Sequence, residues 1–183
     1  MLLQIKSKIH YYFLKKQSIQ KRRSGNMVVL SDAKKIGVLF DADTADSIKN
    51  VKILLKHLLD RSIDVDVLGF VNSRKKDQVH IATLHINYFN LSDLSLFGFP
   101  NSKKTTSFIR KKYDMLINLS LKNSFETNYL ALLSDSQFKV GLYCNNSVFV
   151  YDLMLKLKIQ SLEYFIKHVI HYLDLIDNNH EKQ

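Results

Sequence analysis

Short apolar runs alternate with longer amphipathic segments along most of this chain of 183 residues. The run from Lys35 to Phe40 ends at Asp41, as is typical of a buried strand, and residues 44–59 follow it with apolar side chains at helical spacing. The pattern predicts an α/β fold with a Rossmann-like, open and mostly parallel sheet and helices on both faces. Further strands are predicted over residues 64–71, 86–91, 115–119, 138–142 and 150–159, and helices over 103–112, 125–133 and from Ser161 onward.

Residues 150–159 alternate between apolar and polar side chains, which is typical of an edge strand with one face in water. Sheets of this type often carry an antiparallel strand at their edge. For the strand predicted over residues 150–159, both a parallel and an antiparallel direction therefore stay open.

The basic residues are concentrated at the start of the chain. The net charge is +10, and residues 1–23 contain seven basic side chains and no acidic one. We therefore divide the chain into a basic N-terminal helical arm, residues 1–25, and a single α/β domain, residues 26–183. Such an arm suits a polyanion. Its basic residues are Lys6, Lys8, Lys15, Lys16, Lys21, Arg22 and Arg23.

The arm is predicted to be a helix, because Ile9, Tyr12 and Phe13 belong to an apolar stripe near helical spacing. A Ser-Gly-Asn segment at residues 24–26 would end this helix. We expect the stripe to pack on the domain, with burial in a membrane surface as the alternative. Tyr11 and Tyr12 are candidates for stacking on bases, and core packing is expected for at least one of them.

A second basic group falls in the helix predicted over residues 103–112. Phe108 and Ile109 are expected to turn inward there, which leaves the charges facing solvent. An ordinary solvated helix is one interpretation. The other is a second phosphate-binding surface, if this helix shares a face with the arm. The basic residues are Lys103, Lys104, Arg110, Lys111 and Lys112.

The segment DADT at residues 41–44 resembles the first motif of haloacid-dehalogenase-type phosphatases, which use two aspartates and a magnesium ion. The threonine of that motif falls where this chain has Ala45, and the later strand leads into Ser120 without the carboxylates that complete the magnesium site. We therefore predict that Asp43 or Thr44 caps the following helix. The chain has no glycine-rich phosphate loop, and we assign no catalytic residue, metal or cofactor.

The chain has a single cysteine, Cys144, which excludes a disulfide framework. Its longest apolar runs fall far short of the roughly 20 residues that cross a membrane. No signal-peptide pattern occurs at its start. We therefore predict a cytoplasmic protein.

Three segments carry a family resemblance: LFGFP at residues 96–100, YDMLINLS at 113–120 and FKVGLY at 138–143. They resemble a family of small, basic α/β proteins from Bacteroidetes, which the basic first helix and the last helix match as well. That resemblance implies no activity and no site residues. Residues 113–143 are also similar to a stretch in the N-terminal half of heptosyltransferase-like glycosyltransferases, which implies a shared Rossmann-like topology only.

These features lead to three functional hypotheses. The first is a non-enzymatic module whose basic arm binds structured RNA, such as ribosomal RNA. The second is a small Rossmann-like domain, ligand-binding or degenerate glycosyltransferase- or phosphatase-like, with an unidentified ligand at the carboxyl ends of the strands. The third is attachment of the arm to an anionic membrane surface. The polar groups of the second hypothesis are Asp41, Asp43, Asn72 and Ser120.

Overall fold

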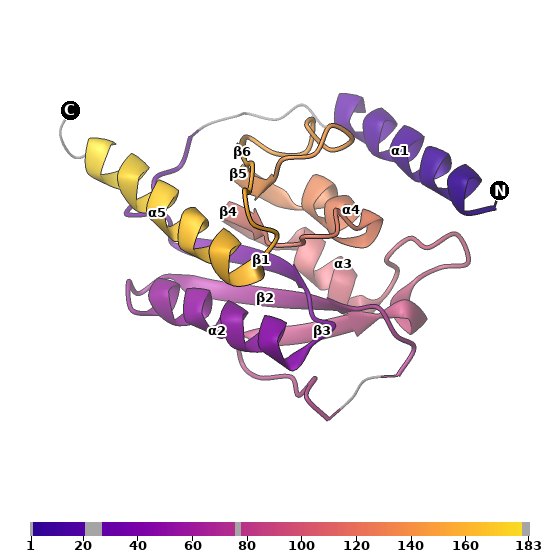
Figure 1. Cartoon of the computed structure of the whole chain (residues 1–183), viewed down its shortest axis with the longest axis horizontal. Helices are drawn as coiled ribbons and strands as arrows, with labels where there is room; N and C mark the ends of the chain where they lie inside the picture. Colours follow the sequence, from indigo (N-terminus) through magenta and orange to yellow (C-terminus); the bar gives the residue numbers. More distant parts are fainter. Residues whose placement is uncertain (1, 21–26, 76–77, 181–183) are drawn as a thin grey trace.

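The computed structural model describes residues 2–20, 27–75 and 78–180, and the side chains of residues 8–19, 27–75 and 78–178. Its strands are β1 (Lys35–Asp41), β2 (Asp64–Val71), β3 (Ile86–Asn90), β4 (Lys112–Asn118), β5 (Asp135–Leu142) and β6 (Leu153–Leu155). Within this described part, the strands form one sheet in the order β3-β2-β1-β4-β5-β6, and every neighbouring pair is parallel (Figure 1). The predicted Rossmann-like α/β fold is confirmed.

Helices cover both faces of the sheet. They are α1 (Leu2–Gln20), α2 (Ala45–Leu59), α3 (Lys103–Arg110), α4 (Phe125–Leu133) and α5 (Leu162–His180), with a short 3-10 helix, η1 (Leu91–Asp93), after β3. On one face, Val51 of α2 and Val169 of α5 share a buried core. On the other face, Leu14 of α1, Phe108 of α3 and Leu130 of α4 share a second core. This cover on two sides explains why the strands are almost uniformly apolar.

The edge strand is shorter than predicted, and the antiparallel direction allowed for it is not the one observed. β6 spans only Leu153–Leu155 and runs parallel to β5. Tyr151 accounts for the difference, because its buried hydroxyl accepts a hydrogen bond from Asn118 Nδ2 at 2.6 Å and donates one to Asn128 Oδ1. The chain is therefore held against β4 and α4 before β6 begins, and residues 150–159 do not continue as one strand.

The basic helix predicted over residues 103–112 is also shorter than expected. α3 ends at Arg110, and Lys111 already has the extended dihedral angles φ −70° and ψ 141°. Lys112 is the first residue of β4, where it lies opposite Asp135 of β5. Residues 111 and 112 therefore do not continue the helix, because Lys112 pairs with β5 in the sheet.

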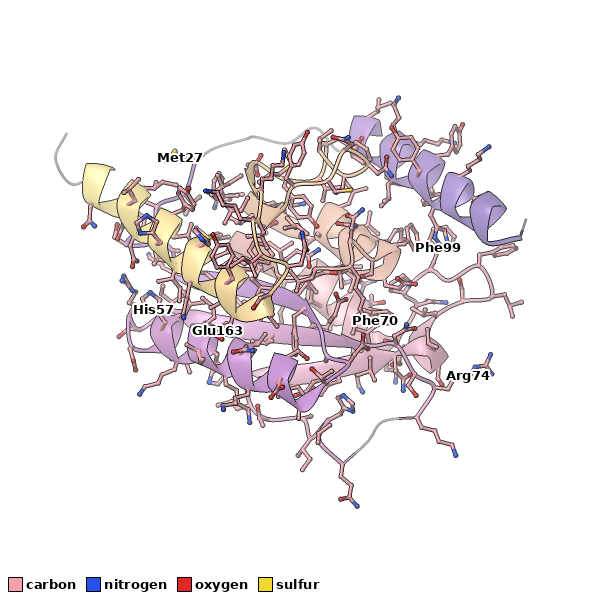
Figure 2. The ribbon with its side chains drawn as sticks, viewed as in Figure 1. Met27, His57, Phe70, Arg74, Phe99 and Glu163 are labelled. Carbon is pink, nitrogen blue, oxygen red and sulfur yellow. The ribbon has the colours of Figure 1, made fainter. Side chains whose placement is uncertain are left out.

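α1 packs on the domain through a cluster of aromatic rings. The ring of His10 stacks on Phe125 of α4 with centroids 3.6 Å apart, and its Nε2 forms a hydrogen bond of 2.9 Å with the carbonyl of Phe97. Phe13 meets Phe99 edge to face with centroids 4.8 Å apart, and Figure 2 shows Phe99 beside α1. These contacts fix the orientation of α1 on the domain.

The expectation that the apolar stripe of α1 packs on the domain is correct for Phe13 and wrong for two of its neighbours. Ile9 and Tyr12 are 49% and 67% exposed, whereas Leu14 is 5% exposed. The contacts of His10 turn the helix so that its buried side runs through residues 10, 13 and 14. Tyr12 consequently points away from the core.

The network around Tyr151 leads to a prediction of stability. In the Tyr151→Phe variant, buried Asn118 and Asn128 each lose a hydrogen-bond partner, so the free energy of unfolding should fall by about 1–3 kcal/mol. Urea unfolding followed by circular dichroism measures it. Tyr172→Phe, at a tyrosine of α5 that is 41% exposed, is the matched control. An equal change in both variants would contradict the structural role of Tyr151.

Candidate functional site

The basic residues of the arm are described only in part. Residues 21–23 lie outside the described residues, and Lys6 lies in α1 without a described side chain. Lys8, Lys15 and Lys16 are exposed. Since the opposite side of α1 packs on the domain, these three ammonium groups face solvent from a helix of fixed orientation.

A shallow groove with a volume of about 640 Å³ runs along α3. Its cations are Lys103, Arg110 and Lys111, and its hydroxyl groups include those of Thr106 and Ser107. Among the residues that the structure describes, no aspartate or glutamate lines this groove. Ammonium, guanidinium and hydroxyl groups all donate hydrogen bonds to phosphate oxygens, so the groove is chemically suited to a phosphate backbone.

The predicted cations of this region differ in whether a neighbouring protein group already pairs with their charge. Lys111 Nζ pairs with Asp66 Oδ1 at 2.6 Å, and Lys104 Nζ donates to the carbonyl of Tyr88 at 3.2 Å. Lys103 and Arg110 form no ion pair within the described part of the chain. These two therefore carry most of the positive potential of the groove, and Lys112 does not line it.

The two basic surfaces lie on the same face of the sheet. α4 contacts both α1 and α3, and Leu14 of α1 and Phe108 of α3 belong to one hydrophobic core. In the described part of the chain, α1 and α3 therefore cover the same face of the sheet, and a joint phosphate-binding surface remains a prediction.

The polar groups of the predicted pocket also come together. Ser120 Oγ donates to Asp41 Oδ2 at 2.7 Å, across the ends of the neighbouring strands β1 and β4. The backbone amide of Asn72 donates to Asp43 Oδ1 at 2.9 Å, and Lys122 Nζ forms an ion pair with Asp43. This is the point of the sheet where the strand order reverses, which is the usual ligand crevice of such folds.

A cavity of about 280 Å³ adjoins this cluster. Asp41, Asp43 and Lys122 line it, together with Leu119, Leu121 and Leu162 and with the start of α2. Burial is the main cause that raises the pKa of Asp41 above its ordinary value; the negative charge of Asp43 acts in the same direction, and hydrogen bonds from Ser120 and the Lys122 amide act against it.

The start of α2 is already capped. Thr44 Oγ1 accepts from the amide of Ser47 at 3.1 Å, and Ser47 Oγ accepts from the amide of Thr44 at 3.3 Å. The prediction that Thr44 caps this helix is confirmed. With this cap in place and with carboxylates nearby, the cavity is poorly suited to an anion.

The tight turn of residues 95–99 is a surface feature that the sequence did not predict. The amide of Gly98 donates to the carbonyl of Ser95, the amide of Ser95 donates to the carbonyl of Phe99, both at 2.8 Å, and Gly98 has a φ of 83°. A glycine in this conformation after two turn residues is typical of a hairpin. Leu96 and Phe97 lie at its tip and are 101% and 71% exposed.

A model described as a family of unknown function, DUF6913, matches residues 6–176. No curated protein and no solved structure matches the chain. Within the described residues, no helix has the length and the apolar character needed to cross a membrane, and no cluster of three metal-ligating side chains is found. The bacterial origin and the glycosyltransferase likeness expected from the sequence remain predictions.

The buried carboxylate of Asp41 leads to a prediction of pH dependence. A raised pKa means that the folded protein holds the proton of Asp41 more readily than the unfolded chain does. The wild-type protein should therefore lose stability relative to Asp41→Asn as the pH rises from about 3.5 through the raised pKa. Unfolding in urea over a pH series measures this difference, with exposed Asp135→Asn as the control. A difference that does not vary with pH would contradict the prediction.

Proposed function

Since the chain belongs to this family of unknown function, we propose a function from its surface: it is a non-enzymatic module that binds the phosphate backbone of RNA. The observation that carries the proposal is the presence of two basic surfaces on one face of the sheet. One is the exposed side of α1, with Lys8, Lys15 and Lys16, and the other is the groove along α3. An RNA target also favours a cytoplasmic protein.

A polymer fits these surfaces better than a single small anion does. The cations lie on two separate helices, and each is exposed rather than gathered in an enclosed pocket. A phosphate backbone presents charges at regular intervals, so that one strand can contact both helices in succession.

A membrane surface is favoured less, because of the way α1 packs. A helix that lies on a membrane buries its apolar side among the lipids. Here that side carries His10, Phe13 and Leu14, and it is occupied by aromatic residues of the domain.

The proposal predicts how charge substitutions change the salt dependence of RNA binding. Each lost phosphate contact lowers the slope of log K against log salt by about 0.7–0.9. The variants Lys15→Gln/Lys16→Gln and Lys103→Gln/Arg110→Gln should each lower the slope by about 1.5 and weaken binding to all RNA sequences alike. Fluorescence anisotropy with a labelled RNA at several salt concentrations measures the slope.

The matched control is Lys52→Gln/Lys56→Gln, which removes the same charge from exposed positions of α2 on the opposite face of the sheet. An equal loss of slope in the control would show that only net charge matters, and would contradict the proposed surface. Substitution is a sharper test than deletion of the arm, because deletion would also remove His10, Phe13 and Leu14 from the second core.

A second candidate function is the binding of a small ligand in the cavity beside Asp41. The contact between Asp41 and Ser120 at the strand-order reversal favours it. Among the described residues, the lining holds the carboxylates of Asp41, Asp43 and Asp46 and one cation, Lys122. Carboxylates accept hydrogen bonds from hydroxyl groups and repel phosphates, so a neutral, hydroxyl-rich ligand such as a sugar fits best.

An NMR titration tests this second candidate. Addition of glucose should shift the amide signals of Asp41, Ser120 and Lys122, and addition of glucose 6-phosphate should shift them less, because of its charge. The shifts should disappear in Asp41→Asn. If both sugars leave these signals unchanged in the wild-type protein, the cavity has no role in sugar binding.

A further inference from the structure

We propose that the turn of residues 95–99 and the outward side of α1 stack on unpaired bases, so that the RNA bound by this protein is single-stranded where it meets them. This inference rests on the proposed function and narrows its substrate to a class of RNA. It is carried by the exposed aromatic residues Phe97 and Tyr12, which the packing of the domain does not explain.

The tip of the turn exposes large apolar groups where turns usually carry small or polar residues. Leu96 and Phe97 are 101% and 71% exposed. The tip is nevertheless held in place: hydrogen bonds between Ser95 and Gly98 and between Ser95 and Phe99 close the turn, and His10 Nε2 bonds to the carbonyl of Phe97. Because the backbone of the tip is already held, little backbone freedom is lost when a base stacks on the exposed ring.

The outward side of α1 combines a tyrosine with cations. Lys8, Lys15 and Lys16 are each three or four residues from Tyr12 and therefore share one side of the helix with it. Tyr12 is 67% exposed, whereas Tyr11 is 39% exposed and meets Phe149 at a ring distance of 6.1 Å. A ring flanked by cations is the arrangement with which proteins hold single strands, since the bases stack on the ring while phosphates pair with the charges.

The aromatic residues and the charges together select unpaired RNA over a duplex. In a duplex, the base faces are covered by their neighbours in the stack, so Phe97 and Tyr12 would find only the backbone and the base edges. In a single strand the base faces are free, and stacking adds to the phosphate contacts of Lys8, Lys15 and Lys16. The hydrogen bond from His10 Nε2 to the carbonyl of Phe97 holds the turn against the inward side of α1.

The chain contains no tryptophan, which allows a direct test. The full-length variant Phe97→Trp carries a single indole at the tip of the turn, and Leu84→Trp carries one at a control position. Leu84 is 88% exposed and precedes β3, whereas the turn follows the carboxyl end of that strand. Each variant is titrated with a 20-nucleotide oligouridine, with an RNA duplex of equal phosphate content, and with phosphatidylserine vesicles.

We expect oligouridine to quench the tryptophan fluorescence of Phe97→Trp and to leave that of Leu84→Trp unchanged. We also expect Phe97→Ala to bind oligouridine at least about fivefold more weakly than the wild-type protein does. Its salt slope and its affinity for the duplex should be those of the wild-type protein. Leu84→Ala should bind like the wild-type protein.

Three results would overturn the proposal. If Phe97→Ala binds oligouridine as the wild-type protein does, with the salt slope intact, stacking is wrong and the phosphate-binding function stands. If the wild-type protein binds neither RNA, the proposed function fails, and this inference fails with it. If vesicles shift the emission of Phe97→Trp to the blue while oligouridine has no effect, the tip binds lipid instead of RNA.

Discussion

The parallel sheet must be covered on both of its faces, and this requirement arranges the rest of the molecule. The inner residues of β1, from Ile36 to Phe40, are all buried, so neither face of this strand tolerates water. β1 lies between β2 and β4, and the connections after β1 and β4 run over opposite faces. The loops after these two strands therefore diverge, and the cavity beside Asp41 opens where they separate.

The same requirement makes α1 part of the domain surface. His10 fills a position among Phe99 and Phe125, and Leu14 completes the core beneath α4. A basic segment that is free in solution loses conformational entropy when it binds a polyanion. Lysines on a docked helix have already lost the backbone part of that freedom, so more of their electrostatic attraction appears as affinity.

The element pattern could be predicted from the sequence where local signals agree with packing. The helix over Phe125–Leu133 was predicted with its observed bounds, and Asp41 and Ser120 could be placed together because both follow buried parallel strands. β6 could not be predicted, because Tyr151 is held by Asn118 and Asn128, which are distant in the sequence.

The orientation of α1 could not be predicted from the sequence either. Apolar spacing favours Ile9 and Tyr12 as buried residues, but His10 takes the inward position through a ring contact and a hydrogen bond with partners far along the chain. The exposure of Leu96 and Phe97 could not be predicted either. Their apolar character predicts burial, whereas the closed turn exposes them to solvent. Only Gly98 gave a local signal, as a residue that favours a turn.

The carboxylates of the cavity and the cations of the proposed RNA-binding surfaces lie on different faces of the sheet. The cavity with Asp41, Asp43 and Asp46 opens beside α2 and α5, whereas the groove of α3 and the lysines of α1 lie on the other face. The sheet and the helices that cover it separate these regions by layers about 10 Å thick. Mobile ions screen charges beyond a Debye length of about 8 Å at physiological ionic strength. In the proposed function, a polyanion on the face of α1 and α3 would therefore be attracted by the local cations with little opposition from the carboxylates of the cavity, although the net charge of the whole chain is only +10.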